Sequence, residues 1–388
     1  MLLNTDGPNT QAAIRTNLGA VFVSLELSKS TWLVTSMSPG SEKMSFHSVK
    51  GGDIAGLFAR FEALRQKAQV RQGKLYPVVV IQEAGLDGFW IERVLAAESW
   101  IESYVVDAAS IAVPRKRRRA KTDRIDGETL IRTLMAYKRG EPRVCSMVKV
   151  PSLEAEDRLR ISRERKALVA ERIAHNNRIK GLLFNQGIRD YEPLCRDRRK
   201  RLEELRTGDG RPLSHHLKAQ IVRELDRLEL LLGQIKAVEA ERDALIAEEK
   251  PDQTAPMTAL LALKGIGAEF AAILYAEGLF QQFGNRRQIA AYAGLAPSPW
   301  QSGTINQEQG VSKAGNPRLR TTMIQLAWLW LRHQPDSALT RWFHVRIDKG
   351  ALRSKKVAIV ALARKLLVAL WKYVHHGIVI EGAIVKAA

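Results

Sequence analysis

Hydrophobic and polar positions in the first part of the chain follow a strand period and then a helix period. The segments 20–27 (AVFVSLEL) and 31–37 (TWLVTSM) are rich in residues that favour strands, and SKS between them suits a hairpin. A third strand is expected at 44–49, and apolar residues recur at helical spacing over 53–68. The continuous apolar run at 76–85 (YPVVVIQEAG) is typical of a strand buried on both faces of a sheet.

A short helix at 87–97 and a strand at 102–107 (ESYVVD) complete this series. Three strands followed by a helix, a strand, a helix and a strand predict an α/β domain with a mixed sheet. We expect this domain to span residues 20–150, and residues 1–19 to be disordered or poorly ordered.

Beyond residue 150 the pattern becomes helical and highly charged over 153–185 and again over 214–248. The second segment carries an apolar stripe at steps of three and four, which is typical of a coiled-coil seam or a core-facing helix. Gly and Pro in the linker RTGDGRPLS would turn the chain back, so we expect an antiparallel helical hairpin within a coiled-coil region over 151–250. The stripe consists of Leu217, Ile221, Leu225, Leu228, Leu232, Ile235 and Val238.

A polar break, EEKPDQTAP, precedes a C-terminal domain expected over 251–388. Residues 260–278 have the helix, Gly-x-Gly turn and helix pattern of a helix-hairpin-helix. In that unit Gly265 and Gly267 would let backbone N–H groups approach a phosphate, whereas a tight turn without a ligand fits the same residues.

The last part of this domain combines a loop pattern with a helix pattern. Residues 293–320 (AGLAPSPWQSGTINQEQGVSKAGNPRLR) predict a long irregular loop, and long loops in compact domains are usually functional or disordered. The apolar-rich segment 354–374 predicts a closing helix that forms core. The predicted fold class is therefore α/β plus all-α.

The composition indicates which class of partner the chain binds. The 388 residues carry 61 Lys and Arg against 41 Asp and Glu, a net charge of +20 with a pI near 10.1. This surplus favours nucleic acid as the partner, with an anionic membrane surface as the competitor. No run reaches the ~20 apolar residues that span a bilayer, and the N-terminus lacks the pattern of a secretory signal, so we expect a cytoplasmic protein. Only Cys145 and Cys195 occur, which argues against structural zinc.

Four carboxylates stand where the α/β domain would bring them together. Glu26 lies in the first strand, and Glu83 ends the long apolar strand, where open α/β sheets place ligand chemistry. Asp123 and Asp126 share one face of a predicted helix, although solvated acids at a helix start would give the same pattern. If the first and fourth strands are neighbours, Glu26 and Glu83 are close, and a helix that starts near residue 123 could bring Asp123 and Asp126 over the same edge of the sheet.

Acids that converge in an apolar setting repel one another unless cations neutralise them. Oxygen ligands favour Mg²⁺ or Mn²⁺, and a pair of such ions about 4 Å apart serves displacement at a phosphodiester. The four acids therefore predict a phosphoryl-transfer centre that acts on nucleic acid.

A basic run directly upstream, RKRRRAK, would hold the phosphate backbone beside this centre. A surface loop or a targeting-like stretch is the alternative interpretation. The cations of the run are Arg115, Lys116, Arg117, Arg118, Arg119 and Lys121.

Five blocks together resemble a known family. They are LSK after the first-strand carboxylate, EAGLDGFW, KTDRID, LAPSPWQSG and GVSKAGNPRLR. The chain closely resembles, over about residues 20–375, the bacterial insertion-sequence transposases that have an acidic tetrad and a serine and are guided by a bridge RNA made from the element's own end. The family's pattern usually begins with Asp, whereas this chain has Glu26, whose longer side chain changes the reach of that ligand.

The resemblance implies a RuvC-like ribonuclease H domain, a coiled coil and a C-terminal transposase domain with a serine nucleophile. The tetrad maps to Glu26, Glu83, Asp123 and Asp126, which would bind Mg²⁺ or Mn²⁺. The serine best maps to Ser302, with Ser298 and Ser312 left open. Phosphates near the attacked bond would be clamped by the next basic segment, for which an ordinary basic helix start is the alternative. The clamp residues would be Lys313, Asn316, Arg318 and Arg320.

The implied chemistry is strand exchange through a covalent phosphoserine link. The implied partners are DNA of the element ends and the target, a non-coding bridge RNA, and further copies of the chain in a dimer or tetramer. A further hypothesis is that the composite site is assembled between subunits, because a long helical spacer separates the serine from the tetrad; the sequence leaves this open.

Two other functions fit parts of the pattern. A RuvC-like structure-specific endonuclease would need the tetrad but not Ser302, because it forms no covalent intermediate. A non-enzymatic basic nucleic-acid-binding protein would use the acids only structurally.

Overall fold

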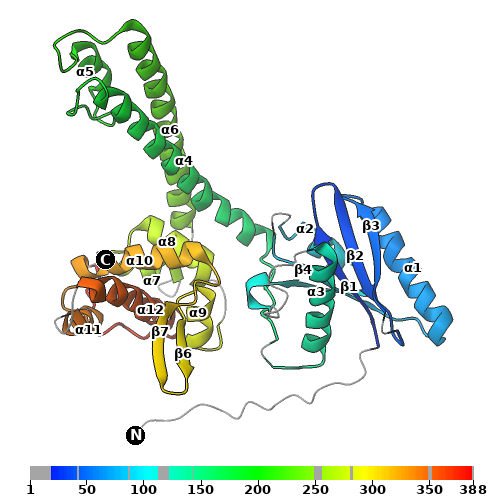
Figure 1. The fold of residues 1–388 in the computed structure, drawn as a ribbon. Coiled ribbons are helices and arrows are strands. Elements are labelled where there is room, and N and C mark those ends of the chain that lie inside the picture. Colours follow the sequence, from blue (N-terminus) through cyan, green and yellow to red (C-terminus); the bar gives the residue numbers. More distant parts are fainter. Residues whose placement is uncertain are drawn as a thin grey trace. The chain divides into compact units, whose positions relative to one another are not determined.

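In the computed structural model the chain divides into two compact units, Met1–Val150 and Pro151–Ala388 (Figure 1). The structure describes residues 19–41, 43–85, 88–111, 122–142, 144–248, 256–279, 283–347 and 352–386. The disorder expected for residues 1–19 falls, up to residue 18, outside these ranges. The predicted mixture of an α/β part and helical parts is confirmed.

The first unit is built on a five-stranded mixed sheet in the order β3-β2-β1-β4-β5. Strand β2 runs antiparallel to β1 and β3, whereas β1, β4 and β5 are parallel. All five strands expected from the sequence are present, with ends shifted by at most two residues. The strands are β1 Val21–Leu27, β2 Thr31–Met37, β3 Ser45–Lys50, β4 Val78–Glu83 and β5 Ile101–Val106.

Helices cover the two faces of this sheet. Alternate residues of β1 and β4 pack on one face against α1 and on the other against α3, because successive side chains of a strand point to opposite faces. Both faces therefore bury apolar side chains, which is why β4 reads as an unbroken apolar run. The helices are α1 Ile54–Gln72, α2 Trp90–Ala96, the 3₁₀ turn η1 Ala108–Ser110 and α3 Asp123–Lys138.

The second unit begins with the predicted helical hairpin, formed by α4 (Leu153–Phe184) and α6 (His215–Glu248), which lie side by side (Figure 1). The short helix α5 (Arg198–Glu204) lies in the connection between them. The stripe predicted on α6 is buried, except that Leu217 and Leu232 are only partly buried. The seam prediction is confirmed.

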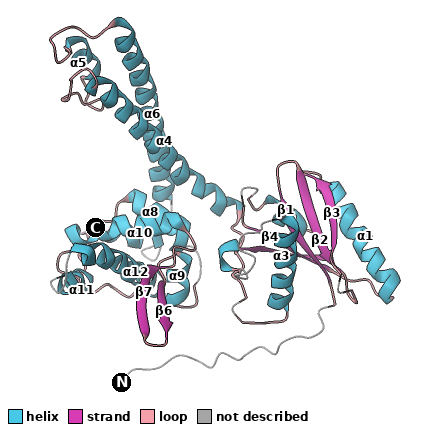
Figure 2. Cartoon of the chain, viewed as in Figure 1, coloured by secondary structure: helices cyan, strands magenta, loops and turns pink. Residues whose placement is uncertain are grey.

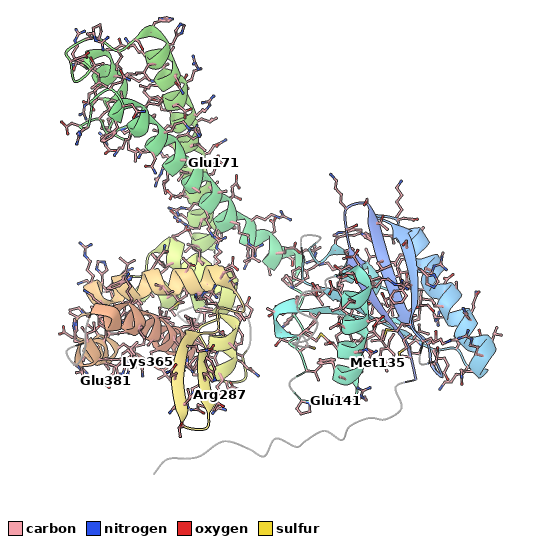
Figure 3. All side chains as sticks on the ribbon, in the orientation of Figure 1. Met135, Glu141, Glu171, Arg287, Lys365 and Glu381 are labelled. Atoms are coloured by element: carbon pink, nitrogen blue, oxygen red, sulfur yellow. The ribbon has the colours of Figure 1, made fainter. Side chains whose placement is uncertain are left out.

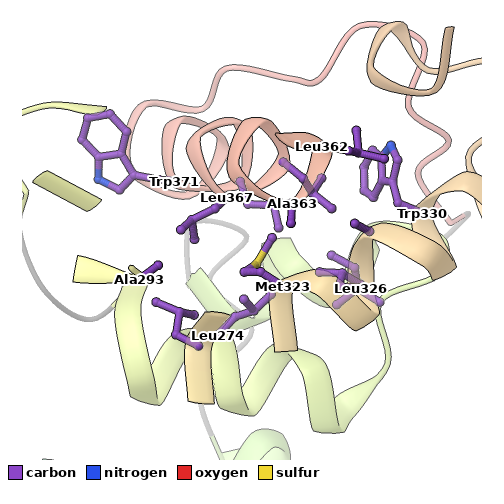
Figure 4. Close-up of a cluster of buried hydrophobic side chains, with 14 of the residues drawn as sticks. Leu274, Ala293, Met323, Leu326, Trp330, Leu362, Ala363, Leu367 and Trp371 are labelled. Carbon is purple, nitrogen blue, oxygen red and sulfur yellow. The ribbon is translucent and has the colours of Figure 1, made fainter. Parts of the chain in front are cut away.

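The rest of this unit is a helical domain around one apolar core (Figure 4). Leu274, Met323, Leu326 and Trp330 meet Leu362 and other residues of the closing helix there, which confirms that this helix forms core. The helices are α7 Pro256–Ala262, α8 Ala268–Leu274, the π-helical turn η3 Tyr275–Leu279, α9 Arg286–Tyr292, α10 Pro317–His333, α11 Ala338–Ile347 and α12 Leu352–His376.

The long irregular loop expected over 293–320 is wrong, because much of it forms an antiparallel hairpin of β6 (Pro297–Ser302) and β7 (Ile305–Val311) (Figure 2). Two prolines in β6 argue against a strand in the sequence, and the register is irregular between them. The ribbon is largely exposed on both faces, so it has no apolar alternation to reveal it. Throughout the described part of the chain, no helix has the length and apolar character of a membrane span.

Candidate active site

Strand pairing places two of the predicted acids side by side. Strands β1 and β4 are parallel neighbours, which is the condition on which the predicted cluster depended. Leu25 pairs with Gln82, and the next residues of the two strands are Glu26 and Glu83. Both carboxylates therefore stand at the carboxyl ends of adjacent parallel strands, where open α/β sheets bind ligands.

The alternation of each strand shows which face these acids share. Phe22 of β1 and Ile81 of β4 pack in the core against α3. Glu26 lies four residues after Phe22, and Glu83 two residues after Ile81, so both belong to the α3 face of the sheet.

The first turn of α3 approaches the sheet closely on this face. The hydroxyl of Ser24 donates to the carbonyl oxygen of Gly127 at 2.9 Å, and a Cβ added at Gly127 would clash with the side chain of Thr35. Asp123 and Asp126 lie in that first turn, Asp126 half-buried and Asp123 exposed. The glycine thus allows the backbone contact that brings this end of the helix over β1 and β2.

Substitution of Gly127 tests this contact. Gly127→Ala would ordinarily favour a helix, but here it is expected to lower the free energy of unfolding by about 1–3 kcal/mol, because the added methyl overpacks the interface with the sheet. Gly181→Ala on α4 is the matched control, since nothing lies within 4 Å of its added Cβ, and it should gain about 0.5–1 kcal/mol. Urea unfolding of the full chain measures both. Equal gains for the two variants would show that α3 does not depend on close approach.

The donor chemistry of the four acids suits Mg²⁺, since all are carboxylates. Within the described ranges, however, no group of three or more His, Cys, Asp or Glu side chains lies close enough to hold a metal ion. The structure brings Glu26 and Glu83 to one edge and the first turn of α3 over the same face. A four-ligand metal site stays a prediction. The basic run from Arg115 to Lys121 lies outside the described residues.

The proposed nucleophile lies at the tip of the β6–β7 hairpin in the second unit. Ser302 is exposed, pairs with Ile305 and precedes Gly303, whose φ of 57° makes the tight turn. Ser298 is half-buried in β6, and the backbone N–H of Ser312 donates to the carbonyl oxygen of Ala296. Among the side chains described in this unit, none hydrogen-bonds to the Ser302 hydroxyl.

Two of the predicted phosphate-clamp residues are engaged internally. Asn316 caps α10 and donates from Nδ2 to Oε2 of Glu277 at 2.9 Å. Nε of Arg318 lies 3.4 Å from Oε1 of Glu277, and its guanidinium also donates to the carbonyl oxygen of Ser162. Burial, partly offset by the nearby carboxylate, lowers the pKa of Arg318. Lys313 is exposed.

The fourth predicted clamp residue, Arg320, donates to the carbonyl oxygen of Lys313 at 2.8 Å. This contact ties the start of α10 to the segment that follows the hairpin.

Glu277 is the site residue that the sequence interpretation missed. It lies in the π-helical turn η3 and is 4% exposed. Its Oε1 also lies 3.6 Å from Nε of Arg163 on α4. It therefore ties the coiled-coil hairpin and the start of α10 to the same turn. A lone acid within the apolar stretch LYAEGLF is the signal that would have revealed it.

Removal of this carboxylate should destabilise the second unit. Glu277→Ala leaves Arg318 buried without its anion, so a loss of about 3–5 kcal/mol in the free energy of unfolding is expected. Glu381→Ala removes an ion pair with Arg341 in which the Glu381 side chain is 79% exposed. This substitution should lower the free energy of unfolding by less than about 1 kcal/mol. Chemical unfolding of both variants gives the comparison, and an equally small cost at Glu277 would show that the network contributes little.

The predicted helix-hairpin-helix glycines lie between α7 and α8. Gly265 has a φ of 90°, and a Cβ there would lie 2.8 Å from Cβ of His333. Nζ of Lys386 donates to the carbonyl oxygen of Ile266 at 3.0 Å. Gly267 forms the N-cap of α8. The turn is thus packed against α10 and the C-terminal segment, and phosphate binding by it stays a prediction.

Comparison with known proteins places the chain in a family. The protein-family model described as "Transposase IS116/IS110/IS902 family" matches residues 257–341. These residues include the hairpin with Ser302 and the segment with Glu277. "Putative transposase y4rJ" of Sinorhizobium fredii is 66% identical over 397 residues, with 100% of both chains covered. The chain belongs to the IS110/IS116 family of transposases.

More distant relatives of this transposase are named for insertion sequences. "Transposase for insertion sequence element IS1111A" of Coxiella burnetii is 29% identical, over 58% of this chain and 60% of its own. "Transposase for insertion sequence element IS1328" of Yersinia enterocolitica is 28% identical, over 61% of this chain and 70% of its own. A transposase acts on DNA, which agrees with the basic composition.

Proposed function

We propose that this transposase cuts and rejoins the DNA of its insertion sequence in the bacterial cytoplasm by phosphoryl transfer. The carboxylates of the first unit and Ser302 of the second unit are the reacting groups. The observation that carries the proposal is the register of β1 and β4, which sets Glu26 beside Glu83 on the face that α3 covers.

A RuvC-like ribonuclease H fold for residues 20–150 is part of this proposal. Its support is the strand order β3-β2-β1-β4-β5, in which three parallel strands extend an antiparallel meander. In such a sheet the carboxyl end of the first strand is central, so its acid lies next to that of the fourth strand.

In the proposed reaction the Ser302 oxygen attacks the phosphorus of one phosphodiester. A serine–phosphate bond forms, the bond to one sugar oxygen breaks, and the leaving oxygen takes up a proton as the serine hydroxyl gives one up. A sugar hydroxyl of the second DNA strand then attacks the phosphoserine, which restores the serine and joins the strands. Mg²⁺ or Mn²⁺, when held by Glu26, Glu83, Asp123 and Asp126, supplies positive charge to the attacked phosphate.

The serine needs a base from outside its own hairpin. No described side chain of the second unit hydrogen-bonds to it, and an exposed serine at its ordinary pKa is a weak nucleophile. We therefore place the acids of the first unit, from the same or another subunit of a dimer or tetramer, at the attacked phosphate.

Target choice in this proposal is delegated to a bridge RNA. The net charge of +20 supports binding of both RNA and DNA. Phosphates would contact the basic run from Arg115 to Lys121 and also Lys313. Purifying the transposase with its bound nucleic acid and sequencing that material tests the idea. A discrete RNA transcribed from DNA flanking the gene is expected, and random fragments would contradict it.

A further inference from the structure

Helices α10, α11 and α12 carry much of the positive charge of the chain. Residues 313–376 contain 13 Lys and Arg but only two acids, Asp336 and Asp348. This stretch therefore supplies about half of the net charge of +20. A surplus so concentrated marks a surface for a polyanion.

Tryptophans stand among these cations on the surface. Nζ of Lys355 lies 5.8 Å from the ring centroid of Trp328, which is 43% exposed on α10. Nζ of Lys365 lies 4.7 Å, and Cζ of Arg346 lies 5.7 Å, from the ring centroid of the half-buried Trp342 on α11. Lys365 is labelled on α12 in Figure 3. We call these five residues the aromatic–basic surface.

The cations of this surface are available to a ligand. Lys355, Lys365 and Arg346 are exposed, and none forms an ion pair with an acid of the described residues. Lys355 and Lys365 stand ten residues apart on α12, which is about 15 Å along the helix. Phe343, the residue after Trp342, has its ring centroid 6.4 Å from that of Trp328.

We infer that the aromatic–basic surface binds a short stretch of single-stranded RNA. Phosphates would contact Lys355, Lys365 and Arg346, and unstacked bases would lie against the exposed parts of Trp328 and Trp342. Stacking on aromatic side chains next to phosphate contacts is how proteins hold splayed RNA bases, whereas paired bases in a duplex do not offer their faces. The inference rests on the proposed function, because the bridge RNA named there is the RNA that this surface would hold, but it requires neither Ser302 nor the acids.

A second copy of this chain is a poorer occupant. Apolar contact between copies would leave at least three cations of each surface facing like charges, which disfavours a self-complementary interface. Nucleic acid neutralises these charges instead.

Fluorescence anisotropy of the full-length protein tests the inference with a labelled single-stranded RNA of about 12 nucleotides. The double variant Lys355→Gln/Lys365→Gln should bind the RNA about tenfold more weakly, with the salt slope of log K reduced by about 1.4, because two phosphate contacts are lost. Trp328→Leu should also weaken binding about tenfold but leave the salt slope unchanged, since it removes base stacking.

Lys74→Gln is the matched control. Nζ of Lys74 lies 5.9 Å from the ring of Tyr76, before β4 and away from the carboxyl ends of the strands, so its removal should change RNA affinity less than twofold. Unchanged RNA binding by the double variant, an equal loss with single-stranded or duplex DNA of the same sequence, or a change in oligomeric state without a change in RNA affinity would each overturn the inference. Loss of DNA cleavage alone would bear only on the proposed function.

Discussion

Asp126→Asn should lower the rate of DNA cleavage by the transposase on the order of 10³-fold, and this is the largest kinetic effect expected in the first unit. The substitution keeps the shape of the side chain and removes only its charge. Asp126 is half-buried in the first turn of α3, and the carbonyl oxygen of the next residue, Gly127, accepts from the Ser24 hydroxyl two residues before Glu26. Cleavage of labelled element-end DNA, with the co-purified nucleic acid and Mg²⁺ present, measures the loss.

The stability of this variant should change little, because an acid near a helix start contributes only about 0.3–1 kcal/mol through the macrodipole. Glu62→Gln provides the control. Glu62 is exposed on α1, which covers the opposite face of the same sheet, so its charge is remote from the proposed site. Cleavage by Asp126→Asn at the rate of Glu62→Gln would favour a non-enzymatic role for the acids.

Ser302→Ala should abolish the covalent protein–DNA link and strand joining together. The side chain is exposed at the hairpin tip, so the free energy of unfolding should stay within about 0.5 kcal/mol of the wild type. Denaturing gel electrophoresis of the reaction with labelled DNA detects the link. Ser298→Ala and Ser312→Ala, which change the other serines of this segment, should retain it.

Two outcomes would contradict the role of Ser302 as the nucleophile. Persistent strand cleavage by Ser302→Ala, with no link formed by the wild type, would favour a structure-specific endonuclease. Loss of the link in Ser298→Ala or Ser312→Ala instead would move the nucleophile along the segment. Mixing Ser302→Ala subunits with Asp123→Ala subunits then tests sharing of the site, because activity in the mixed oligomer requires acids and serine from different chains.

The elements of the first unit were readable from local periodicity. Strands β1 to β5 alternate or run apolar because helices cover both faces of their sheet, and burial on a fixed face leaves a clear pattern. The seam of α6 was readable for the same reason. The pairing of β1 with β4 could be posed only as a condition, since the two strands are separated by about fifty residues and pairing over that distance is decided by tertiary packing.

Two features of the second unit could not be predicted from local sequence patterns. The β6–β7 hairpin buries little, so neither face carries the alternation that identifies a strand. The network around Glu277 joins η3, α4 and α10, which are distant in sequence, and so it emerges only from the assembled fold. Arg318 looked like a phosphate ligand because its charge was visible in the sequence and its partner was not.

The central claim is that acids of β1, β4 and α3 share one cation site, and iron-directed radical cleavage of the backbone measures this most directly. Fe²⁺ replaces Mg²⁺ in the transposase with its nucleic acid, peroxide and ascorbate start the reaction, and mass spectrometry maps the cuts. We expect cuts near Glu26, near Glu83 and in the first turn of α3, all lost in Asp126→Asn and all retained in Glu62→Gln. Cuts confined to other segments, or a pattern that Asp126→Asn leaves unchanged, would contradict the claim.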